Sequence, residues 1–439
     1  MTTLEKLGLH RPELRAWASY DWALSGMQTV IMTAVFPVFF VSVAAANYEG
    51  SAATQQLARA NTIALVIVAL LSPILGAISD FTASKKRFLA LFTLIGALAC
   101  AGMVRIQEGD AVLASTLFII ALVGATGCMV FYEGLLPHIA SREEMDRVST
   151  AAYGIGYLGG GLLVALNLLW IQQPEWFGLG TTANAARASF VSVAVWWLIF
   201  AIPIFRRVPE KRMLESDERP DQNAVRVGFR RMRETISELR GYRQAFLLLV
   251  AFLIYNDGIS TIIKMATAYG KELGIEDSVL IAAVVLVQFV GVPFAFLFGR
   301  LAGRIGAKTA IFIGLGVYAV ISILGYFMRT PLHFVVLAGL VGMVQGGTQA
   351  LSRSLFASMI PAHKSGEFFG FYSVFEKFAG IFGPLLFYLA IEATGSSRSA
   401  ILSIIVFFII GAILLSRVDV REGQEVAQRR EQELLRTLT

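Results

Sequence analysis

Charged side chains interrupt several long apolar stretches of this 439-residue sequence. A charge in the middle of a membrane costs at least a few kcal/mol, so it usually faces a cavity or a partner of opposite charge. Asp257 lies about fourteen residues into a stretch at 244–270, roughly 20 Å along a helix that rises 1.5 Å per residue. This places its carboxyl group near the middle of a bilayer. We expect it to bind a proton or a cation.

Lys264 follows Asp257 by seven residues, which is about 700° around a helix, so the two side chains point to nearly the same face. Lys264 stands roughly 10 Å further along that face. A lysine in this place can hold the carboxylate of a solute while the aspartate takes up a proton or an amine. The alternative is structural, with each charge neutralised by a neighbouring helix.

Three further charges lie within apolar stretches. Glu133 stands four residues before Pro137, where it can serve as an inner proton relay or pair with an arginine of the adjoining loop. Glu376 and Lys377 are neighbours, and neighbours on a helix point about 100° apart, so they cannot both line one cavity. We expect one of them to bond to another helix, and we favour Glu376 over Lys377 as functional.

Neutral polar residues in the same stretches are candidates for the lining of a cavity. Hydrogen bonds between packed helices are the alternative role for such side chains. The candidates are Gln28, Asn256, Gln288, Gln345 and Gln349.

The elements that must position these side chains are membrane-spanning helices. Hydrophobic residues make up 56% of the chain and charged residues 15%, against about 25% charged in an ordinary soluble domain. A helix needs roughly twenty mostly apolar residues to cross the hydrocarbon, because lipid offers the backbone no hydrogen-bond partner. We predict an all-α integral membrane protein with twelve transmembrane helices, at 22–46, 57–79, 88–106, 111–136, 149–172, 187–205, 244–270, 279–299, 309–328, 332–352, 367–391 and 397–416.

A charged connector divides these helices into two groups of six. Apolar residues from Val225 to Leu239 alternate there with arginines, which is typical of a basic amphipathic helix on an anionic membrane surface. A solvated linker is the alternative. The tail from Arg421 is expected to be an exposed helix whose function the sequence does not indicate. The predicted parts are an N-terminal bundle at 1–206, a cytoplasmic linker at 207–243, a C-terminal bundle at 244–418 and a cytoplasmic tail at 419–439.

The 37 Lys and Arg residues orient the chain. If both termini are cytoplasmic, 29 of them lie on the inner side, six lie in outer loops, and Lys264 and Lys377 lie within helices. Positive residues in short loops are retained in the cytoplasm, so we predict a multi-pass membrane protein with both ends inside. The first 22 residues hold no cleavable apolar core, and the first helix is expected to be retained. The net charge of +6 follows from this topology and indicates no nucleic-acid partner.

The sequence offers no set of residues for catalysis, a cofactor or a metal. Gly154-Ile-Gly-Tyr-Leu-Gly159 has the letters of a dinucleotide fingerprint, but it lies in an apolar stretch with no strand before it, which favours close helix packing. The segment from Gly303 to Thr309 lacks the Gly-Lys pair of a phosphate loop. Cys100 and Cys128 fall within predicted helices and are interpreted as small buried hydrophobes. We expect neither an enzyme nor a primary pump.

Both halves place a Gly and basic cluster between their second and third helices. The first, Gly76-Ala-Ile-Ser-Asp80-Phe-Thr-Ala-Ser-Lys85-Lys-Arg87, resembles the signature loop of the major facilitator superfamily. The second copy runs from Gly299 to Lys308, offset by 223 residues, and parallel six-plus-six repeats are what these transporters use. Five other segments resemble the autophagy-related vacuole-effluxer branch: Ala16-Trp-Ala-Ser-Tyr-Asp-Trp-Ala23, Phe131-Tyr-Glu-Gly-Leu-Leu-Pro137, Tyr255-Asn-Asp-Gly-Ile-Ser-Thr261, Gln349-Ala-Leu-Ser-Arg-Ser-Leu-Phe356 and Glu367-Phe-Phe-Gly-Phe-Tyr372.

The resemblance implies a mechanism and a gate. Two six-helix bundles would rock about a midplane cavity lined by the first, fourth, seventh and tenth helices. Asp80 would belong to a cytoplasmic gate that controls the exchange of conformations. The gating candidates are Asp80, Gly76, Lys86, Arg87 and Arg304.

The resemblance also implies a class of solute. The branch is associated with amino-acid export from the yeast vacuole, and its bacterial members are largely of unknown function. The resemblance to those members implies a bacterial inner membrane. We expect a monomeric secondary transporter in membrane lipid that exports a small amphiphilic or zwitterionic solute, with protons as the coupling ion. A lipid or drug exporter of the same fold is one alternative. A receptor or scaffold that transports nothing is another.

Overall fold

The computed structural model describes residues 3–48, 52–210, 223, 226–227, 229–230, 241–379, 382–394 and 396–438. Every regular element within these ranges is a helix, as predicted. Eleven helical stretches there are long and apolar enough to cross a membrane. The eleventh predicted helix, 367–391, is present as two shorter ones. The protein is an all-α membrane protein.

The N-terminal half forms from an interrupted first span and five long helices. The first span comprises α2 (Pro12–Met27), η1 (Gln28–Ala34), α3 (Val35–Phe39) and η2 (Phe40–Ala44), where η1 and η2 are π-helical. The long helices are α4 (Ala52–Thr82), α5 (Lys85–Gly102), α6 (Ala111–Gly134), α8 (Met145–Gln172) and α9 (Thr182–Arg207). The short elements are α1 (Thr3–Lys6), η3 (Met103–Arg105), α7 (Leu136–Ile139) and η4 (Pro174–Phe177).

The C-terminal half has four long helices followed by shorter ones. The long helices are α11 (Arg243–Glu272), α12 (Asp277–Ile305), α13 (Ala307–Tyr326) and α14 (Pro331–Ser358). The remaining elements are η5 (Ala362–Lys364), α15 (Ser365–Phe378), α16 (Phe382–Thr394), α17 (Ser397–Ser403), α18 (Ile405–Ser416) and α19 (Val420–Leu438).

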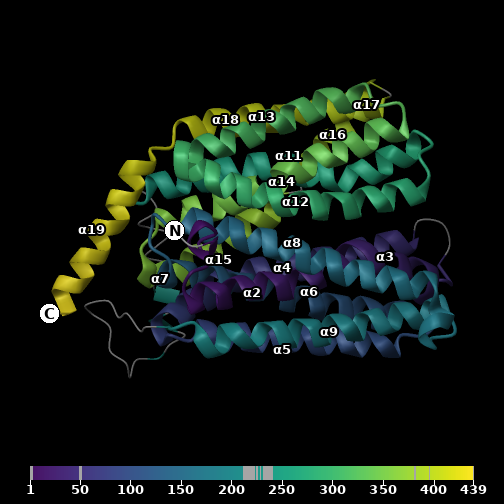
Figure 1. Cartoon of the computed structure of the whole chain (residues 1–439), viewed down its shortest axis with the longest axis horizontal. Helices are drawn as coiled ribbons and strands as arrows, with labels where there is room; N and C mark the ends of the chain where they lie inside the picture. The colour runs from purple at the N-terminus through teal and green to yellow at the C-terminus, as the bar shows by residue number, and fades with distance from the viewer. Residues whose placement is uncertain are drawn as a thin grey trace.

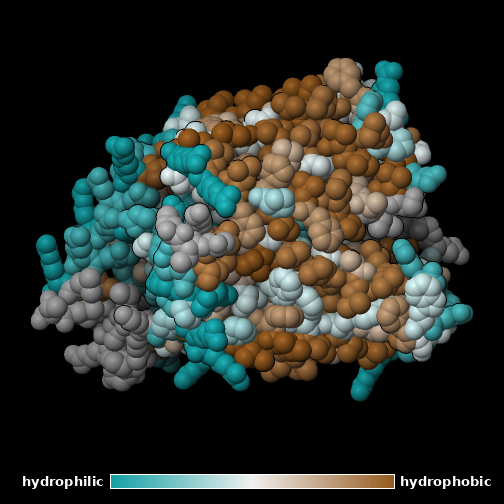
Figure 2. Space-filling model, viewed as in Figure 1, coloured by the Kyte–Doolittle hydropathy of each residue, from teal (hydrophilic) through white to brown (hydrophobic). Residues whose placement is uncertain are grey.

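The two halves lie side by side with their helices roughly aligned (Figure 1), α2 to α9 in the lower part of the view and α11 to α14 with α16 to α18 in the upper part, whereas α15 packs against α4 of the N-terminal half. Both chain ends lie at the same end of the bundle. We call this the basic end; it also holds Lys85, Lys86 and Arg142. A broad hydrophobic belt separates it from a second hydrophilic end (Figure 2). This belt is the surface that faces lipid, since water would not solvate it.

Two predicted boundaries were wrong in ways that matter for function. The helix predicted at 332–352 extends to Ser358, so Arg353, which the charge distribution assigned to a loop, is a buried helix residue. The predicted helix 367–391 is not continuous, because α15 ends at Phe378 and α16 begins at Phe382. Phe378 precedes an extended residue, Ala379, whose backbone no longer continues the helix.

The first span also differs from its prediction, since it begins at Pro12 and not at residue 22. Proline is favoured in the first turn of a helix, where its missing N–H has no partner to lose. The buried residues of the added turns include Trp17, Tyr20 and Asp21. Because this segment contains many polar residues, the sequence did not reveal that one face of its helix is buried.

The predicted amphipathic helix of the linker falls mostly on residues outside the described ranges. The tail forms the helix α19, as predicted, but it is not free of the bundle. Ala427 and Leu434 are buried, and Gly423 lies against the side chain of Met359.

The glycines of α8 serve close packing, as predicted for the false dinucleotide motif. A Cβ on Gly159 would lie 2.8 Å from atoms of Trp22, and one on Gly154 would lie 2.9 Å from Phe296. These glycines therefore let α8 approach α2 of its own half and α12 of the other.

Candidate functional site between the two halves

A buried arginine at the boundary of the two halves makes the most extensive polar contacts of the site. Arg353 of α14 donates from Nε to Ser149 Oγ at 2.9 Å and from Nη2 to the Ser149 carbonyl oxygen at 3.1 Å. Nη1 and Nη2 both lie 3.3 Å from Oδ2 of Asp21. Glu133 Oε1 is 4.0 Å from Nη1. We call Arg353, Asp21, Glu133 and Ser149 the arginine lock.

Aromatic rings enclose the guanidinium group. Its Cζ lies 4.8 Å from the ring centroid of Trp17, 5.7 Å from that of Tyr132 and 4.5 Å from that of Tyr153. The negative ring faces attract the cation, and more strongly where water is excluded. Tyr132 also donates from its hydroxyl to Asp21 Oδ2 at 2.9 Å. One buried cation thus faces two buried carboxylates within an apolar wall.

The arginine lock joins the halves, since Arg353 belongs to the C-terminal half and its partners belong to the N-terminal half. Neighbouring bonds join the same helices. Ser149 Oγ donates to the Ala350 carbonyl at 2.7 Å, and Ser354 Oγ donates to Asp146 Oδ1 at 2.6 Å. Any motion that parts α14 from α8 must break these bonds together.

A second junction lies where α4 meets the start of α15. Asp80 accepts hydrogen bonds from the backbone amides of Gly366 at 3.1 Å and Glu367 at 2.8 Å. It is buried and forms an ion pair with the buried Lys85. A carboxylate at a helix N-terminus satisfies unpaired N–H groups and the positive end of the helix dipole. Asp80 therefore holds α15 of the opposite half.

Glycines make this second junction possible. A Cβ on Gly76 would lie 2.2 Å from the Gly366 carbonyl oxygen, and one on Gly370 would lie 2.6 Å from that of Ser72. We call Gly76, Gly366 and Gly370 the glycine seam. Beside it, Ser365 Oγ donates to the Gly134 carbonyl at 2.7 Å.

The helix α19 adds a third junction at the basic end. Glu431 accepts from the backbone N–H of Ala362 at 2.9 Å and pairs with Arg142 at 3.4 Å. Arg142 of the N-terminal half also donates from Nε to the Ser358 carbonyl at 3.0 Å. One carboxylate on the tail thus bridges both halves.

Glu431→Ala should lower the apparent melting temperature and loosen the basic end, because both bridging bonds are lost. The pair is partly exposed, so we expect a modest effect of about 1 kcal/mol. Glu433→Ala is the matched control, since Glu433 makes only an exposed pair with Arg430 on the same helix. Differential scanning fluorimetry of both variants measures the difference. Equal melting temperatures would show that Glu431 bridges nothing of consequence.

Asp257 of α11 lies apart from these junctions, at the break between α15 and α16. Its carboxylate is fully buried and accepts from the backbone amides of Phe382 at 3.0 Å and Gly383 at 2.9 Å. Glu376, near the end of α15, is half-buried. The side chains of Lys264 and Lys377 lie outside the described part of the structure. Asp257 thus binds the start of the second half-helix.

The other predicted site residues are dispersed. Asn256 and Gln288 each hold a buried side-chain oxygen with no hydrogen-bond partner among the described residues. Gln28 is exposed at the start of η1, whereas Gln345 and Gln349 are half-buried on α14.

Of the three predicted basic gating residues, Lys86 forms a hydrogen bond to the backbone that follows α9. Lys86 Nζ donates to the Val208 carbonyl at 2.9 Å, whereas Arg87 and Arg304 are exposed. The described residues hold no group of three or more His, Cys, Asp or Glu that could bind a metal ion.

Asp21, Arg353 and Lys85 were not predicted as site residues from the sequence. Asp21 and Arg353 stand inside the segments that carry the family resemblance, and this was the available signal. Arg353 was hidden because the tenth helix was predicted to end at residue 352, whereas α14 continues to Ser358. Lys85 was hidden because three basic residues stand in a row at 85–87 and nothing in their order tells which is buried.

The family described as "Vacuole effluxer Atg22 like" matches residues 53–428 of this chain. The chain belongs to this Atg22-like family. An uncharacterized MFS-type transporter of Bacillus subtilis, YxiO, is 36% identical over 416 residues, which cover 94% of this chain and 96% of YxiO. Autophagy-related protein 22 of Yarrowia lipolytica is 27% identical over 309 residues, which are 64% of this chain and 52% of that protein. The chain thus spans about half of that fungal relative.

Solved structures show the fold of this Atg22-like chain. The proton:xylose symporter XylE superposes with a TM-score of 0.68 at 13% identity, covering 94% of this chain and 96% of XylE. The human organic anion transporter MFSD10 superposes with a TM-score of 0.69 at 15% identity, covering 94% and 100%. Such likeness establishes the major facilitator fold, and the homologues are MFS transporters and effluxers and not enzymes.

Proposed function

We propose that this MFS-type transporter exports a small zwitterionic, amino-acid-like solute by alternating access, driven by proton entry. In this proposal the basic end faces the cytoplasm of a bacterium, and the monomer is the transporting unit. The name of the family as vacuole effluxers supports outward movement of solute. The buried charges of both signs between the helices suit a solute that itself carries both signs.

The observation that carries the proposal is the carboxylate of Asp257 at a broken helix. Asp257 stands fourteen residues after Arg243, which is roughly 20 Å along α11 and near the bilayer midplane. Transporters place their solute and ion sites at such breaks, where half-helix ends present unpaired backbone groups. Proton uptake by this carboxylate would weaken its two bonds to α16, so that protonation and helix position are linked. Lys264, seven residues further along α11, is proposed to hold the carboxylate of the solute.

The junctions between the halves fit one stage of the transport cycle. Among the described residues, the hydrogen bonds that join the two halves lie in the half of the bundle nearer the basic end. With the basic end cytoplasmic, the protein is closed to the cytoplasm. Export would then require the arginine lock and the glycine seam to open so that solute can enter.

Asp257→Asn should abolish the dependence of transport on a pH gradient, because an amide cannot take up the coupling proton. The measurement is the movement of L-leucine, L-tyrosine and L-arginine in proteoliposomes with and without an imposed pH gradient. Wild type should move at least one of the three solutes faster with the gradient than without it. If wild type moves none of the three, the proposed substrate class is wrong.

The control for Asp257→Asn is Asp110→Asn, which alters a carboxyl group at the start of α6 outside the hydrocarbon. Size-exclusion chromatography checks that both variants remain monodisperse. An Asp257→Asn variant that keeps the full response to the pH gradient would remove Asp257 from the coupling mechanism.

A further inference from the structure

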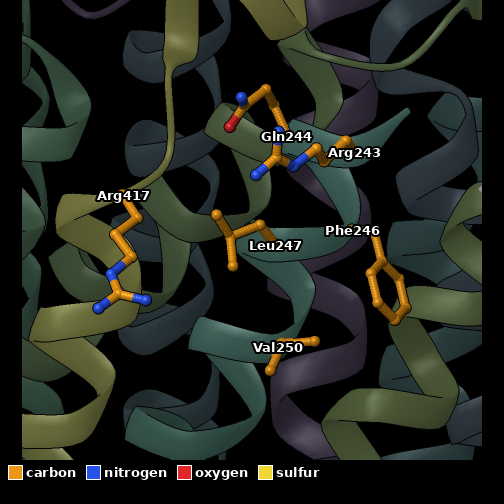
Figure 3. A pocket seen from close by; sticks show the side chains of 6 residues that line it. All are labelled: Arg243, Gln244, Phe246, Leu247, Val250 and Arg417. Carbon is orange, nitrogen blue, oxygen red and sulfur yellow. The ribbon is translucent and has the colours of Figure 1, made fainter. Parts of the chain in front are cut away.

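We propose that the groove between α11 and α18 at the basic end binds an anionic glycerophospholipid of the adjoining leaflet, such as phosphatidylglycerol. The groove is a pocket of about 350 Å³ lined by Arg243, Gln244, Phe246, Leu247, Val250 and Arg417 (Figure 3). It lies on the outer surface of the C-terminal half, away from the arginine lock. Nothing in the transport mechanism uses it.

The lining of the groove divides by chemistry. Arg243 is the first residue of α11 and Arg417 follows the last residue of α18, so both arginines stand at the end of the hydrophobic belt. Phe246, Leu247 and Val250 continue along α11 toward the hydrocarbon. Figure 3 shows Arg417 on one side of Leu247, with Arg243 above it and Val250 below. In a bound phospholipid, the phosphate would lie against the two arginines, and an acyl chain would lie against the apolar side chains.

Arg243 and Arg417 are exposed, and neither guanidinium group has a hydrogen-bond or ion-pair partner among the described residues. Both arginines line the same pocket, so an anion bound in it is attracted by two positive charges. Arg is the cation best suited to a phosphate group, because its planar fork donates two parallel hydrogen bonds. The groove therefore supplies the charge that an anionic head group needs.

The backbone that carries Arg417 is held in place on both sides. Lys308 Nζ donates to the carbonyl oxygens of Ser416 at 2.9 Å and Val418 at 2.8 Å. The buried side chain of Gln244 accepts from the backbone N–H of Asp419 at 2.9 Å. The turn after α18 is thus bonded to α13 and to α11, and Arg417 is fixed at the rim of the groove.

The nearby acidic residues are engaged elsewhere. Glu422 accepts from Gln244 Nε2 at 2.5 Å, and Asp419 accepts from the Glu422 backbone N–H at 3.0 Å at the start of α19. Among the described residues, neither carboxylate forms an ion pair with Arg243 or Arg417, so both arginines are available to a ligand.

The test is binding of phosphatidylglycerol to the full-length protein, measured by native mass spectrometry after delipidation and by thermal shift. Phosphatidylethanolamine and inorganic phosphate are the comparison ligands. Wild type should retain phosphatidylglycerol over phosphatidylethanolamine, whereas the double variant Arg243→Gln/Arg417→Gln should bind it about thirtyfold more weakly, since each arginine near a membrane surface contributes about 1 kcal/mol. The matched control is Arg429→Gln/Arg430→Gln on α19, which should bind as wild type does.

A second variant tests the acyl channel separately. Val250→Trp fills the groove without removing a charge, and it should reduce lipid retention while leaving the arginines in place. The proposal is overturned if the double variant and the α19 control bind phosphatidylglycerol equally. It is also overturned if phosphatidylethanolamine binds as tightly as phosphatidylglycerol, or if inorganic phosphate alone raises the melting temperature as much as the lipid does.

Discussion

Arg353→Ala should abolish transport and lower the free energy of unfolding by about 3–5 kcal/mol, which is the cost of removing one partner from a buried ion pair. The buried carboxylate of Asp21 would lose its ion-pair partner, and that of Glu133 would lose a positive charge 4.0 Å away. The rings of Trp17 and Tyr153 would also lose the guanidinium cation that they enclose. No other substitution proposed for this protein removes as many buried contacts.

The expected change has a conformational part as well as a stability part. Arg353 makes its hydrogen bonds and its ion pairs to the opposite half of the protein. Its loss should therefore favour the state in which the basic end is open. Spin labels on Glu143→Cys and Thr309→Cys, which are exposed on opposite halves, report this opening as a longer distance. The native Cys100 and Cys128 are both buried, but opening of the protein could expose them to the label. They are therefore replaced by Ala in the labelled background.

Arg429→Ala is the control for this prediction. Arg429 is exposed and pairs with Glu425 on the same helix at 3.3 Å. Pairs of this kind contribute less than about 1 kcal/mol, so the control should leave stability, distance and transport near those of wild type. If Arg353→Ala resembles Arg429→Ala in all three measurements, the arginine lock does not hold the halves together.

The contrast between apolar length and charge explains what could be predicted from the sequence. Twenty apolar residues in a row have few alternatives to a membrane helix, so the helices and the two halves were evident. Asp80 was recognised through its motif. Its partners, the backbone amides of Gly366 and Glu367, belong to a distant segment, and no spacing rule connects them to Asp80.

Arg353 shows why a buried charged residue could not be predicted from the sequence. A charged residue at the end of an apolar run reads as the start of a loop, because isolated charges are costly in lipid. Asp21, 332 positions earlier in the chain, removes that cost by pairing with it. The break after Phe378 is hidden for a related reason, since Asp257 on another helix satisfies the amides that the break exposes. Long-range polar partners decided each of these features.

Gly76→Ala should open the glycine seam and reduce transport by at least about tenfold. The added Cβ would lie 2.2 Å from the carbonyl oxygen of Gly366 and 2.6 Å from its carbonyl carbon. Both are backbone atoms, so no side-chain rotation relieves the clash and the helices α4 and α15 must move apart. Overpacking of this kind costs about 1–3 kcal/mol. That cost falls on the closed state alone and favours opening of the basic end by roughly ten- to a hundredfold.

The distance between labels at Glu143→Cys and Thr309→Cys measures this shift, and Gly316→Ala is its control. Gly316 lies within α13, and a Cβ there would meet nothing within 4 Å. Alanine is preferred to glycine in a helix by about 0.5–1 kcal/mol, so the control should be at least as stable as wild type. Both substitutions improve helix propensity equally, and they differ only in what the new methyl group touches. A lengthened distance in Gly76→Ala alone would therefore assign the effect to contact between the halves, whereas unchanged distances in both variants would show that closure does not depend on the glycine seam.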